Sequence, residues 1–415
     1  MAVLGIVAEF NPFHNGHRLL LEQASHAGPF DAVICVMSGS FLQRGEPAIC
    51  HKWARAEMAL KCGADLVMEL PFCFAARSAY FFARGALQLL QRTGVVTHLA
   101  FGCETPRWDT LESIASLLAS EPREYRERLK HYLDQGLNFA LARSRSLNEF
   151  AAHRIGPVDD ILAAPNNILA LEYLRVIKEE RLPFTPVPVV RQGSSYHDTD
   201  LHPLASATAI RRLLLEEHNP GRLKEAMPPS SFAVLRKQIN EGKAPVRFES
   251  LGPPLLIKLR TMSCRELENI YEISEGLENR IIEAANHSGS LRELTASVKS
   301  RRYSLTRIQR TLIYILFSLT RDQVEEFDQH GPLYLHVLGF SSKGRKILQD
   351  MKNKSTLPIL SRGSEVKRWW EKSRDKVLKD MLALDCMSTD IHALLFPEPS
   401  ARHGSLDYTT SPVMV

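Results

Sequence analysis

Short apolar runs alternate with stretches of helical composition through the first half of the chain. The runs are rich in β-branched and aromatic residues, and each is soon followed by a polar or turn-forming residue, as buried strands usually are. Strands separated by helical stretches imply right-handed crossovers, which produce a parallel sheet with helices on both faces. We therefore predict an α/β fold with a doubly wound parallel sheet, whose strands cover residues 3–7, 31–37, 64–70, 95–101 and 184–190.

The pattern changes beyond about residue 225. Two consecutive prolines interrupt it near residue 253, and the apolar positions that follow recur at helical spacing. A chain of 415 residues is too long for one ordinary core and suggests two domains. We predict an α/β catalytic domain at residues 1–225 and a mainly helical domain at residues 226–415, with a small α/β segment around residues 333–340. The helices of the second domain are predicted at residues 255–261, 264–273, 277–285, 291–299 and 306–317.

The first predicted strand ends at a turn with the sequence His14-Asn15-Gly16-His17, and a helix follows it. The first backbone N–H groups of a helix have no partner within the helix, and the helix dipole adds positive charge there, so the turn favours an anion such as a phosphate. His14 and His17 are three residues apart, so both rings can point to one side above the carboxyl end of the strand. Gly16 allows a nucleotide to approach the backbone closely.

Two imidazole rings beside a phosphate suit attack on the α-phosphorus of a nucleoside triphosphate. Charge then develops on the non-bridging oxygens and on the departing diphosphate, and N–H donors already in place stabilise it. The alternative is that His14 and His17 are ordinary surface or helix-capping residues. Their place behind an apolar strand and around a glycine favours the catalytic interpretation.

Other strand ends at the same edge of the sheet carry polar or small residues. Gly102 follows the fourth strand, where it either lets an adenosine pass closely or forms a plain turn. Asn166 and Asn167 precede a helical run, where they either contact the nucleotide or cap the helix. Arg191 ends the fifth strand, within reach of a phosphate or of the adenine face.

The blocks around the first turn are more specific than the turn alone. Residues 9–17 read EFNPFHNGH, residues 36–48 read VMSGSFLQRGEPA, residues 52–55 read KWAR, and residues 165–169 read PNNIL. HNGH resembles the HxGH signature of the nucleotidyltransferase superfamily. The blocks in this order resemble the bacterial tRNA(Met) cytidine acetate ligase family over most of the chain. The resemblance implies a Rossmann-like domain of the HxGH nucleotidyltransferase type.

The stretch from Ser206 to Arg211 is similar to the second signature of that superfamily, ISSTxIR. In the superfamily the hydroxyl groups and the arginine of this signature hold the outer phosphates. Ala205 and Ala207 stand here for the first isoleucine and the second serine, so one hydroxyl contact is absent. Ser206, Thr208 and Arg211 remain as candidates for binding diphosphate. The alternative is a helix N-cap followed by a solvated arginine.

The resemblance implies that His14 and His17 are catalytic. It also implies that residues of the turn, of the strand ends and of the second signature bind the nucleotide. The expected nucleotide-binding residues are Val7, Ala8, Glu9, Phe10, Asn11, Pro12, Phe13, Asn15, Gly16, Arg18, Leu19, Leu20, Gly102, Asn166, Asn167, Arg191, Ser206, Thr208 and Arg211.

Basic residues that are candidates for tRNA contact fall in three places. Arg44 lies in a glycine-containing loop at residues 38–48, and Lys52 and Arg55 begin the next helix. This loop either closes on the acyl substrate or the target base, or is simply solvated. Two further groups adjoin an aromatic residue, which suits an RNA backbone and an unstacked base, although charge runs are often solvated faces. Their members are Lys299, Arg301, Arg302, Arg307, Arg310, Lys343, Arg345 and Lys346.

The composition is that of a globular protein, with 44% hydrophobic and 24% charged residues, and the net charge of +5 is only a mild bias toward nucleic acid. Seven cysteines without a CxxC pair predict free thiols in a reducing cytosol, and no zinc site is expected. The amino terminus lacks the pattern of a signal peptide, and no apolar run approaches the roughly 20 residues of a membrane span. We expect a soluble, cytoplasmic protein.

The resemblance implies an ATP-dependent ligase. Such an enzyme activates acetate as acetyl-adenylate and acetylates N4 of the wobble cytidine of elongator tRNA(Met), releasing AMP and diphosphate. ATP is then a substrate, with Mg²⁺ expected on its phosphates. No dedicated metal site, membrane contact or obligate protein partner is predicted. Two alternatives stay open, namely an adenylyltransferase that acts on a small phosphorylated substrate and a non-catalytic nucleotide- or RNA-binding protein.

Overall fold

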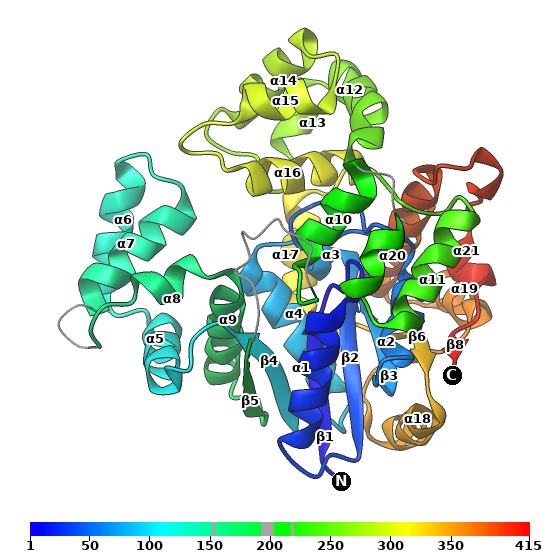
Figure 1. The fold of residues 1–415 in the computed structure, drawn as a ribbon. Helices are drawn as coiled ribbons and strands as arrows, with labels where there is room; N and C mark the ends of the chain where they lie inside the picture. The colour runs from blue at the N-terminus through cyan, green and yellow to red at the C-terminus, as the bar shows by residue number, and fades with distance from the viewer. Residues whose placement is uncertain (152–154, 192–202, 217–219) are drawn as a thin grey trace.

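The computed structural model describes residues 1–151, 155–191, 203–216 and 220–415. A single 8-stranded sheet runs through the molecule in the order β5-β4-β1-β2-β3-β6-β7, with β8 paired to β6 (Figure 1). The strands are β1 Val3–Ala8, β2 Ala32–Ser38, β3 Leu66–Leu70, β4 His98–Cys103, β5 Thr185–Val190, β6 Leu335–Phe340, β7 Ile359–Leu360 and β8 Val413–Met414.

The strands predicted in the first half of the chain, now β1 to β5, are confirmed, and they are parallel. Val3 is in register with Ala32, Leu4 with His98, and residue 98 in turn with Thr185. Because all of these strands run the same way, their carboxyl ends lie at one edge of the sheet. This carboxyl edge is where a doubly wound sheet binds its ligand.

The small α/β segment predicted around residues 333–340 contains one strand, β6, which joins the same sheet. β6 runs antiparallel to β3, with Phe340 opposite Leu66 and His336 opposite Glu69. It supplies hydrogen-bond partners to an edge of β3 that is otherwise open. The sheet therefore contains strands from both halves of the chain, and the predicted domain boundary at residue 225 stays a prediction.

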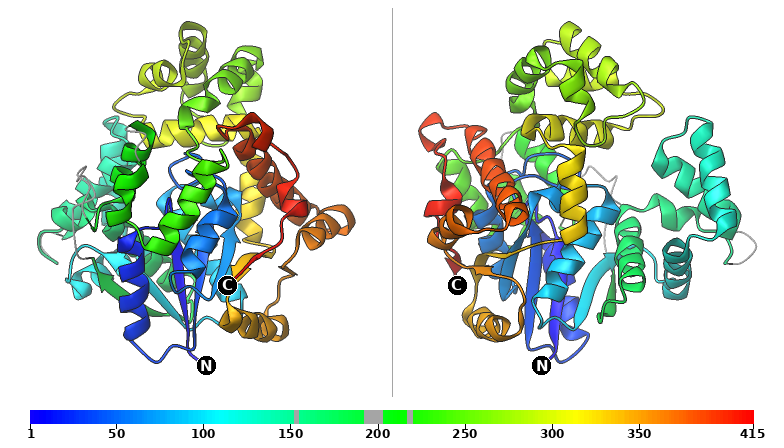
Figure 2. Two further views of the ribbon diagram at one scale, coloured as in Figure 1. Left: turned by 45° about the vertical axis from the view of Figure 1, so that its right-hand side comes forward. Right: turned by 180° about the vertical axis from the view of Figure 1, so that it is seen from behind.

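Helices cover both faces of the sheet, as a doubly wound fold requires. Successive residues of β2 enter different cores, because side chains alternate across a strand: Val33, Cys35 and Met37 face one core, and Ile34 and Val36 face the other. The first face is covered by α1 Asn15–His26, α2 Lys52–Leu60, α10 Ala207–Glu216 and α11 Pro229–Asn240, and the second by α4 Ala79–Arg92 and α9 Pro165–Glu179 (Figures 1 and 2).

Two helical arms extend from the sheet (Figures 1 and 2). The insertion arm, residues 108–163, lies between β4 and α9 and contains α5 Trp108–Ser120, α6 Arg123–Asp134, α7 Phe139–Ala151 and α8 Asp159–Ala163. The helical lobe, residues 252–317, contains the helices predicted there. They are α12 Gly252–Thr261, α13 Cys264–Glu268, α14 Leu277–His287, α15 Leu291–Val298 and α16 Leu305–Phe317.

Shorter elements and the carboxyl-terminal helices complete the chain. They are α3 Phe72–Ala75, α17 Arg321–His330, α18 Ser342–Lys354, α19 Gly363–Lys372, α20 Lys376–Leu394, α21 Leu406–Thr409 and the 3₁₀ turns η1 Pro220–Glu225, η2 Phe248–Leu251 and η3 Pro399–Ala401. Among the described residues no helix has the length and apolar character needed to cross a bilayer. All seven cysteines are free thiols, as predicted.

Candidate active site

The turn between β1 and α1 holds the two histidines side by side. β1 ends at Ala8, and Phe10 adopts a positive φ of 46°, so the chain turns sharply there. His14 is the N-cap of α1, with an extended backbone at φ −133° and ψ 176°. The rings of His14 and His17 have centroids 3.9 Å apart and are inclined by 37°. The structure thus brings the two rings together, as their spacing predicts for a helix that begins at Asn15.

Hydrogen bonds define which ring nitrogen of each histidine carries the proton. The backbone N–H of Gly16 donates to Nδ1 of His14 at 3.0 Å, and the backbone N–H of His14 donates to Nδ1 of His17 at 3.3 Å. A neutral imidazole has one N–H group. Because each Nδ1 is an acceptor, the proton of each neutral ring lies on Nε2. Both Nε2–H donors are then left for a ligand.

The surroundings of the two rings favour the neutral form. Burial and the positive charges of Arg191 and Arg211 lower the pKa of His14 to about 3. Burial, together with His14 and Arg191, lowers the pKa of His17 well below its usual value of 6.5. Both histidines are therefore neutral at physiological pH and act as N–H donors, not as cations.

The tautomer and the pKa of these rings can be measured together. In ¹H–¹⁵N spectra of the imidazole groups, we expect His14 and His17 to carry the proton on Nε2 and to show no titration between pH 8 and pH 5. The reason is that protonation of the neutral rings requires a pH below their lowered pKa values. A histidine with the ordinary pKa of about 6.5 would titrate within this range. An Nδ1–H signal or a titration near pH 6.5 at either residue would contradict the assignment.

The backbone amides at the start of α1 are already engaged. The N–H of Asn15 donates to the carbonyl oxygen of Ala226 at 3.0 Å, and the N–H of His17 donates to that of His14 at 2.9 Å. The N–H of Gly16 is used by the His14 ring. All three partners lie outside α1, so these amides have no partner within the helix, as expected, but none of the three is free to bind an anion. An anion at this turn meets imidazole N–H groups and arginine side chains, and the dipole of α1 adds to their attraction.

Gly16 is required by the His14 ring. A Cβ atom on residue 16 would lie 2.9 Å from Cε1 and 3.1 Å from Nδ1 of His14. A larger residue would displace the ring from its hydrogen bond. The glycine therefore admits the histidine, in addition to the nucleotide approach that the sequence suggests.

Two arginines flank the histidines. Nη1 of Arg211 donates to the carbonyl oxygen of Asn11 at 2.9 Å, and Nη2 lies 3.3 Å from Oγ1 of Thr208. Arg191 lies over Gly102, where a Cβ atom would be 3.4 Å from its Cγ. Two guanidinium groups beside two neutral N–H donors suit a polyphosphate, because they attract negative charge without protonating the imidazoles.

An open cavity adjoins the turn at the carboxyl edge. Seven of the expected nucleotide-binding residues line it, from the strand ends, the start of α1 and the start of α9. The walls are mainly apolar with a few polar groups, as expected for a nucleoside site. These seven are Val7, Gly16, Leu19, Leu20, Gly102, Asn166 and Arg191.

Five further lining residues were not among the expected ones. Gln23 follows Gly16, Leu19 and Leu20 on one face of α1, and Leu169 and Tyr173 follow Asn166 on one face of α9. The helical spacing of three and four residues was the signal that could have identified them. The others are Phe101 and Val189, which precede Gly102 and Arg191 at the ends of their strands.

The two asparagines of α9 have different surroundings. Asn166 lines the cavity, and its side-chain amide donates to the carboxylate of Glu104. Asn167 is buried, and its Oδ1 accepts from the backbone N–H of Glu104 at 2.7 Å. Neither caps the helix, whose N-cap is Ala164. Through this hydrogen bond, Asn167 joins α9 to the residue after β4, and it thereby positions Asn166 at the cavity.

The remaining expected residues do not line the cavity. The Ser206 hydroxyl accepts from the backbone N–H of Ala209 at 3.1 Å and so caps α10, as the alternative interpretation held. Contact with the nucleotide stays a prediction for all of the expected residues, whether or not they line the cavity. Those that do not line it are Ala8, Glu9, Phe10, Asn11, Pro12, Phe13, Asn15, Arg18, Asn167, Ser206, Thr208 and Arg211.

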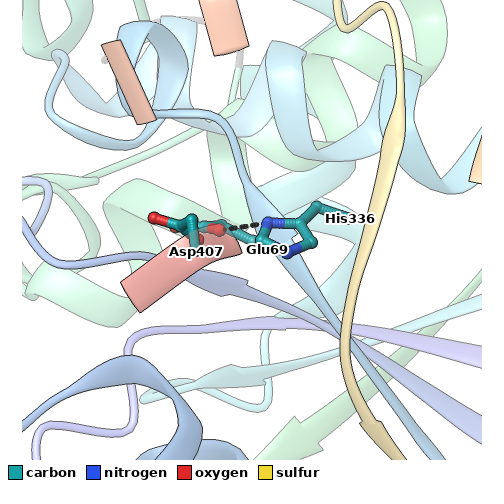
Figure 3. A group of neighbouring side chains, drawn as sticks. All are labelled: Glu69, His336 and Asp407. Atoms are coloured by element: carbon teal, nitrogen blue, oxygen red, sulfur yellow. Dashed lines mark hydrogen bonds and ion pairs between the residues drawn. The ribbon is translucent and has the colours of Figure 1, made fainter. Parts of the chain in front are cut away.

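A buried group of charges lies beneath the loop after β2. Glu69, His336 and Asp407 place their ligand atoms within 4.8 Å of one another (Figure 3). Nζ of Lys52 lies 2.7 Å from Oε2 of Glu69 and 2.6 Å from Oδ1 of Asp407, and Nδ1 of His336 lies 2.7 Å from the same Glu69 oxygen. The ammonium group already supplies the positive charge, so these residues do not fit a metal ion. The absence of a dedicated metal site stays a prediction.

Three of the basic residues expected to contact tRNA lie inside the protein. Lys52 and Arg55 are fully buried, and Arg310 is only 9% exposed. Arg55 donates to the carbonyl oxygens of Glu9 and Gly39, and Arg310 pairs with a glutamate of the helical lobe at 3.6 Å. None of the three is accessible to RNA in this structure, so we leave them out of the proposed tRNA surface.

The exposed basic residues among those expected to contact tRNA form two groups, one on the helical lobe and one on α18. Lys299, Arg301 and Arg302 are exposed in the loop before α16, on the helical lobe. The group of Lys343, Arg345 and Lys346 is exposed on α18. Because β6 runs antiparallel to β3, α18 begins at the amino ends of the parallel strands, away from the cavity. The remaining two, Arg44 and Arg307, are partly buried.

The fold and the site define a nucleotidyltransferase of the HIGH class. Residues 1–407 match the family model described as HIGH Nucleotidyl Transferase. The chain is 55% identical to the tRNA(Met) cytidine acetate ligase of Syntrophomonas wolfei, over 100% of this chain and 99% of the relative. It is 38% identical to the protein of the same name from Halothermothrix orenii, over 98% of each.

Solved structures agree with this assignment. The crystal structure of apo TmcAL from Thermotoga maritima matches with a TM-score of 0.95 at 36% identity, over 100% of both chains. The same protein bound with alpha-thio ATP matches with a TM-score of 0.92. The chain therefore belongs to the tRNA(Met) cytidine acetate ligase family, which confirms the resemblance seen in its HNGH turn and neighbouring blocks.

Proposed function

We propose that this protein is an ATP-dependent ligase that acetylates N4 of the wobble cytidine of elongator tRNA(Met), using acetate and releasing AMP and diphosphate. The observation that carries the proposal is the pair of neutral histidines beside the cavity, flanked by Arg191 and Arg211. Full-length relatives with the name tRNA(Met) cytidine acetate ligase support it, and so does the TmcAL structure with alpha-thio ATP.

The first step forms acetyl-adenylate. An acetate oxygen forms a bond to the α-phosphorus of ATP, and the bond from that phosphorus to the bridging oxygen of diphosphate breaks. The Nε2–H groups of His14 and His17 donate to the oxygens on which negative charge develops. Arg191 and Arg211 hold the phosphates, and the cavity between α1 and α9 holds the adenosine.

The second step transfers the acetyl group. The N4 amine of the cytidine attacks the carbonyl carbon of acetyl-adenylate, AMP leaves with the electrons of the broken C–O bond, and the amine loses a proton. Mg²⁺ on the ATP phosphates and a cytoplasmic location remain part of the proposal.

The test is AMP release by the purified protein with ATP, acetate and total tRNA, each omitted in turn, followed by nucleoside analysis of the digested tRNA. We expect AMP release that requires acetate and tRNA, with N4-acetylcytidine in the digest. Turnover of ATP that does not depend on acetate would instead support the adenylyltransferase alternative. Nucleotide binding without turnover would support the binding-protein alternative.

Charge reversal at the helical lobe tests the tRNA surface. The double variant Arg301→Glu, Arg302→Glu should bind tRNA more weakly and with a shallower salt dependence, because each lost phosphate contact reduces the slope by roughly one. Acetate-dependent exchange of diphosphate into ATP, measured without tRNA, should stay unchanged. The matched control is Lys343→Glu, Lys346→Glu, which makes the same charge change at the opposite edge of the sheet. Weaker binding in the control alone would move the surface to α18.

A further inference from the structure

Both helical arms are anchored at the carboxyl edge of the sheet. The insertion arm leaves after β4 and returns at α9, where Asn166 lines the cavity. The helical lobe is anchored through α16, because a Cβ atom on Gly45 would lie 2.6 Å from the backbone nitrogen of Arg310. Nε2 of Gln309 also donates to Oε1 of Glu46 at 3.3 Å. The two arms therefore flank the edge where a substrate must reach the nucleotide.

A hydrogen bond joins the two arms. Oδ1 of Asn138 accepts from the backbone N–H of Leu141 at 3.1 Å and thereby caps α7. Nδ2 of the same amide donates to the carbonyl oxygen of Arg301 at 3.3 Å. We call the surface formed by Asn138, Phe139, Leu141, Lys299 and Arg301 the arm junction.

The arm junction combines exposed apolar groups with exposed cations. Phe139 is 57% exposed and Leu141 39% exposed, next to the residue that bridges the arms. Lys299 and Arg301 are exposed on the other side of the bridge. Among the described residues, Phe139 is the most exposed aromatic side chain. An exposed aromatic ring beside exposed cations offers RNA both a surface for base stacking and positive charge for the backbone.

The loop that carries the cations is held in shape. Nε of Arg280 donates to the carbonyl oxygen of Val298 at 2.8 Å, and Nη2 donates to those of Ser297 at 2.8 Å and Lys299 at 3.2 Å. A loop ordered before binding loses little entropy when a ligand arrives. Its basic side chains are thus presented on a fixed backbone.

We infer that the arm junction binds the single-stranded part of the tRNA anticodon loop, with an unpaired base stacked on Phe139 and flanking phosphates held by Lys299 and Arg301. Proteins that read RNA loops stack unpaired bases on aromatic side chains and neutralise the backbone with nearby cations. The target cytidine must enter at the carboxyl edge, which both arms flank. This inference rests on the proposed function and deepens it.

The test separates tRNA binding from ATP chemistry. In Phe139→Ala, the KM for tRNA in the acetylation reaction should rise about tenfold, as loss of a stacking aromatic residue usually causes. Phe139→Tyr should restore the KM to near that of the wild type, because it keeps the ring. Acetate-dependent diphosphate exchange without tRNA should be unchanged in both variants. The control is Leu394→Ala, which removes another apolar side chain, 60% exposed, at the end of α20.

Three results would overturn the inference. The first is an unchanged KM for tRNA in Phe139→Ala. The second is a loss of exchange activity in that variant, which would place Phe139 in the ATP site or the fold. The third is a KM for tRNA that rises in Trp370→Ala but not in Phe139→Ala. This result would place the RNA on α19, where Trp370 is 40% exposed. Failure of the proposed function itself would appear differently, as absence of acetate-dependent exchange in the wild-type protein.

Discussion

Replacing His17 by alanine should reduce acetate-dependent diphosphate exchange by at least tenfold, and by ~10²–10³-fold if its contribution is that of a typical transition-state donor. The backbone N–H of His14 donates to Nδ1 of His17, so the proton of the His17 ring lies on Nε2. The alanine variant loses this Nε2–H donor. Exchange measured without tRNA reports only the formation of acetyl-adenylate, so tRNA binding does not affect the result.

Two further variants show whether the lost group is the donor. His17→Gln places an amide N–H near the position of Nε2 and should recover part of the activity. His26→Ala removes an exposed histidine from the last turn of the same helix and should leave exchange unchanged. Near-normal exchange in a folded His17→Ala variant would remove the histidine pair from the mechanism. Far-ultraviolet circular dichroism would confirm that the variants are folded.

The second large effect is expected for stability. Replacing Lys52 by methionine should lower the free energy of unfolding by about 3–5 kcal/mol, because it leaves the buried carboxylates of Glu69 and Asp407 without their cation. Guanidinium unfolding measures this change. The matched control is Lys61→Met, which removes a 40% exposed lysine near the end of the same helix and should change the value by less than about 0.5 kcal/mol.

The effect of Lys52→Met should depend on pH in a defined direction. Burial raises the pKa of Glu69, but Lys52 and His336 lower it further, so the folded-state pKa lies below the unfolded value of 4.5. In the wild type, the contribution of Glu69 is complete above pH 4.5 and is lost as the pH falls toward the folded-state value.

Without Lys52, burial dominates and raises the pKa of Glu69, so proton uptake relieves the buried charge as the pH falls. The stability deficit of Lys52→Met should therefore be larger at pH 8 than at pH 5. Adding Glu69→Gln to this variant should recover part of the deficit at pH 8. A deficit below about 1 kcal/mol, or one that does not change with pH, would mean that the ion group contributes little to the fold.

Much of the fold was predictable because its signals are local. β2 and β3 are buried on both faces and therefore appear as continuous apolar runs, whereas β5 lies at the edge of the sheet and is largely exposed. The capping geometry of α1 was predictable for the same reason, since His14, Gly16 and His17 are close neighbours and their hydrogen bonds follow from helix geometry.

The basic residues show where local signals fail. Lys52 and Arg55 resemble an exposed basic helix start in sequence, yet both are buried. The acidic partners of Lys52 come from β3 and α21, and α21 lies near the other end of the chain. In the same way, few acidic residues lie near Arg302 and Arg310 in the sequence. In the structure, Glu275 pairs with Arg302 and Glu272 pairs with Arg310.

By itself, the sequence determined the parallel strands, the helices and the position of the HNGH turn, because each depends on residues within one or two helical turns. Only the tertiary structure decided that β6 enters the sheet antiparallel, that Lys52 faces Glu69 and Asp407, and that Asn138 reaches Arg301. It also decided that the backbone N–H of Asn15 donates to the carbonyl oxygen of Ala226. These contacts join residues far apart in the chain, and their pairing depends on the packing of the whole molecule, which hydrophobic periodicity does not encode.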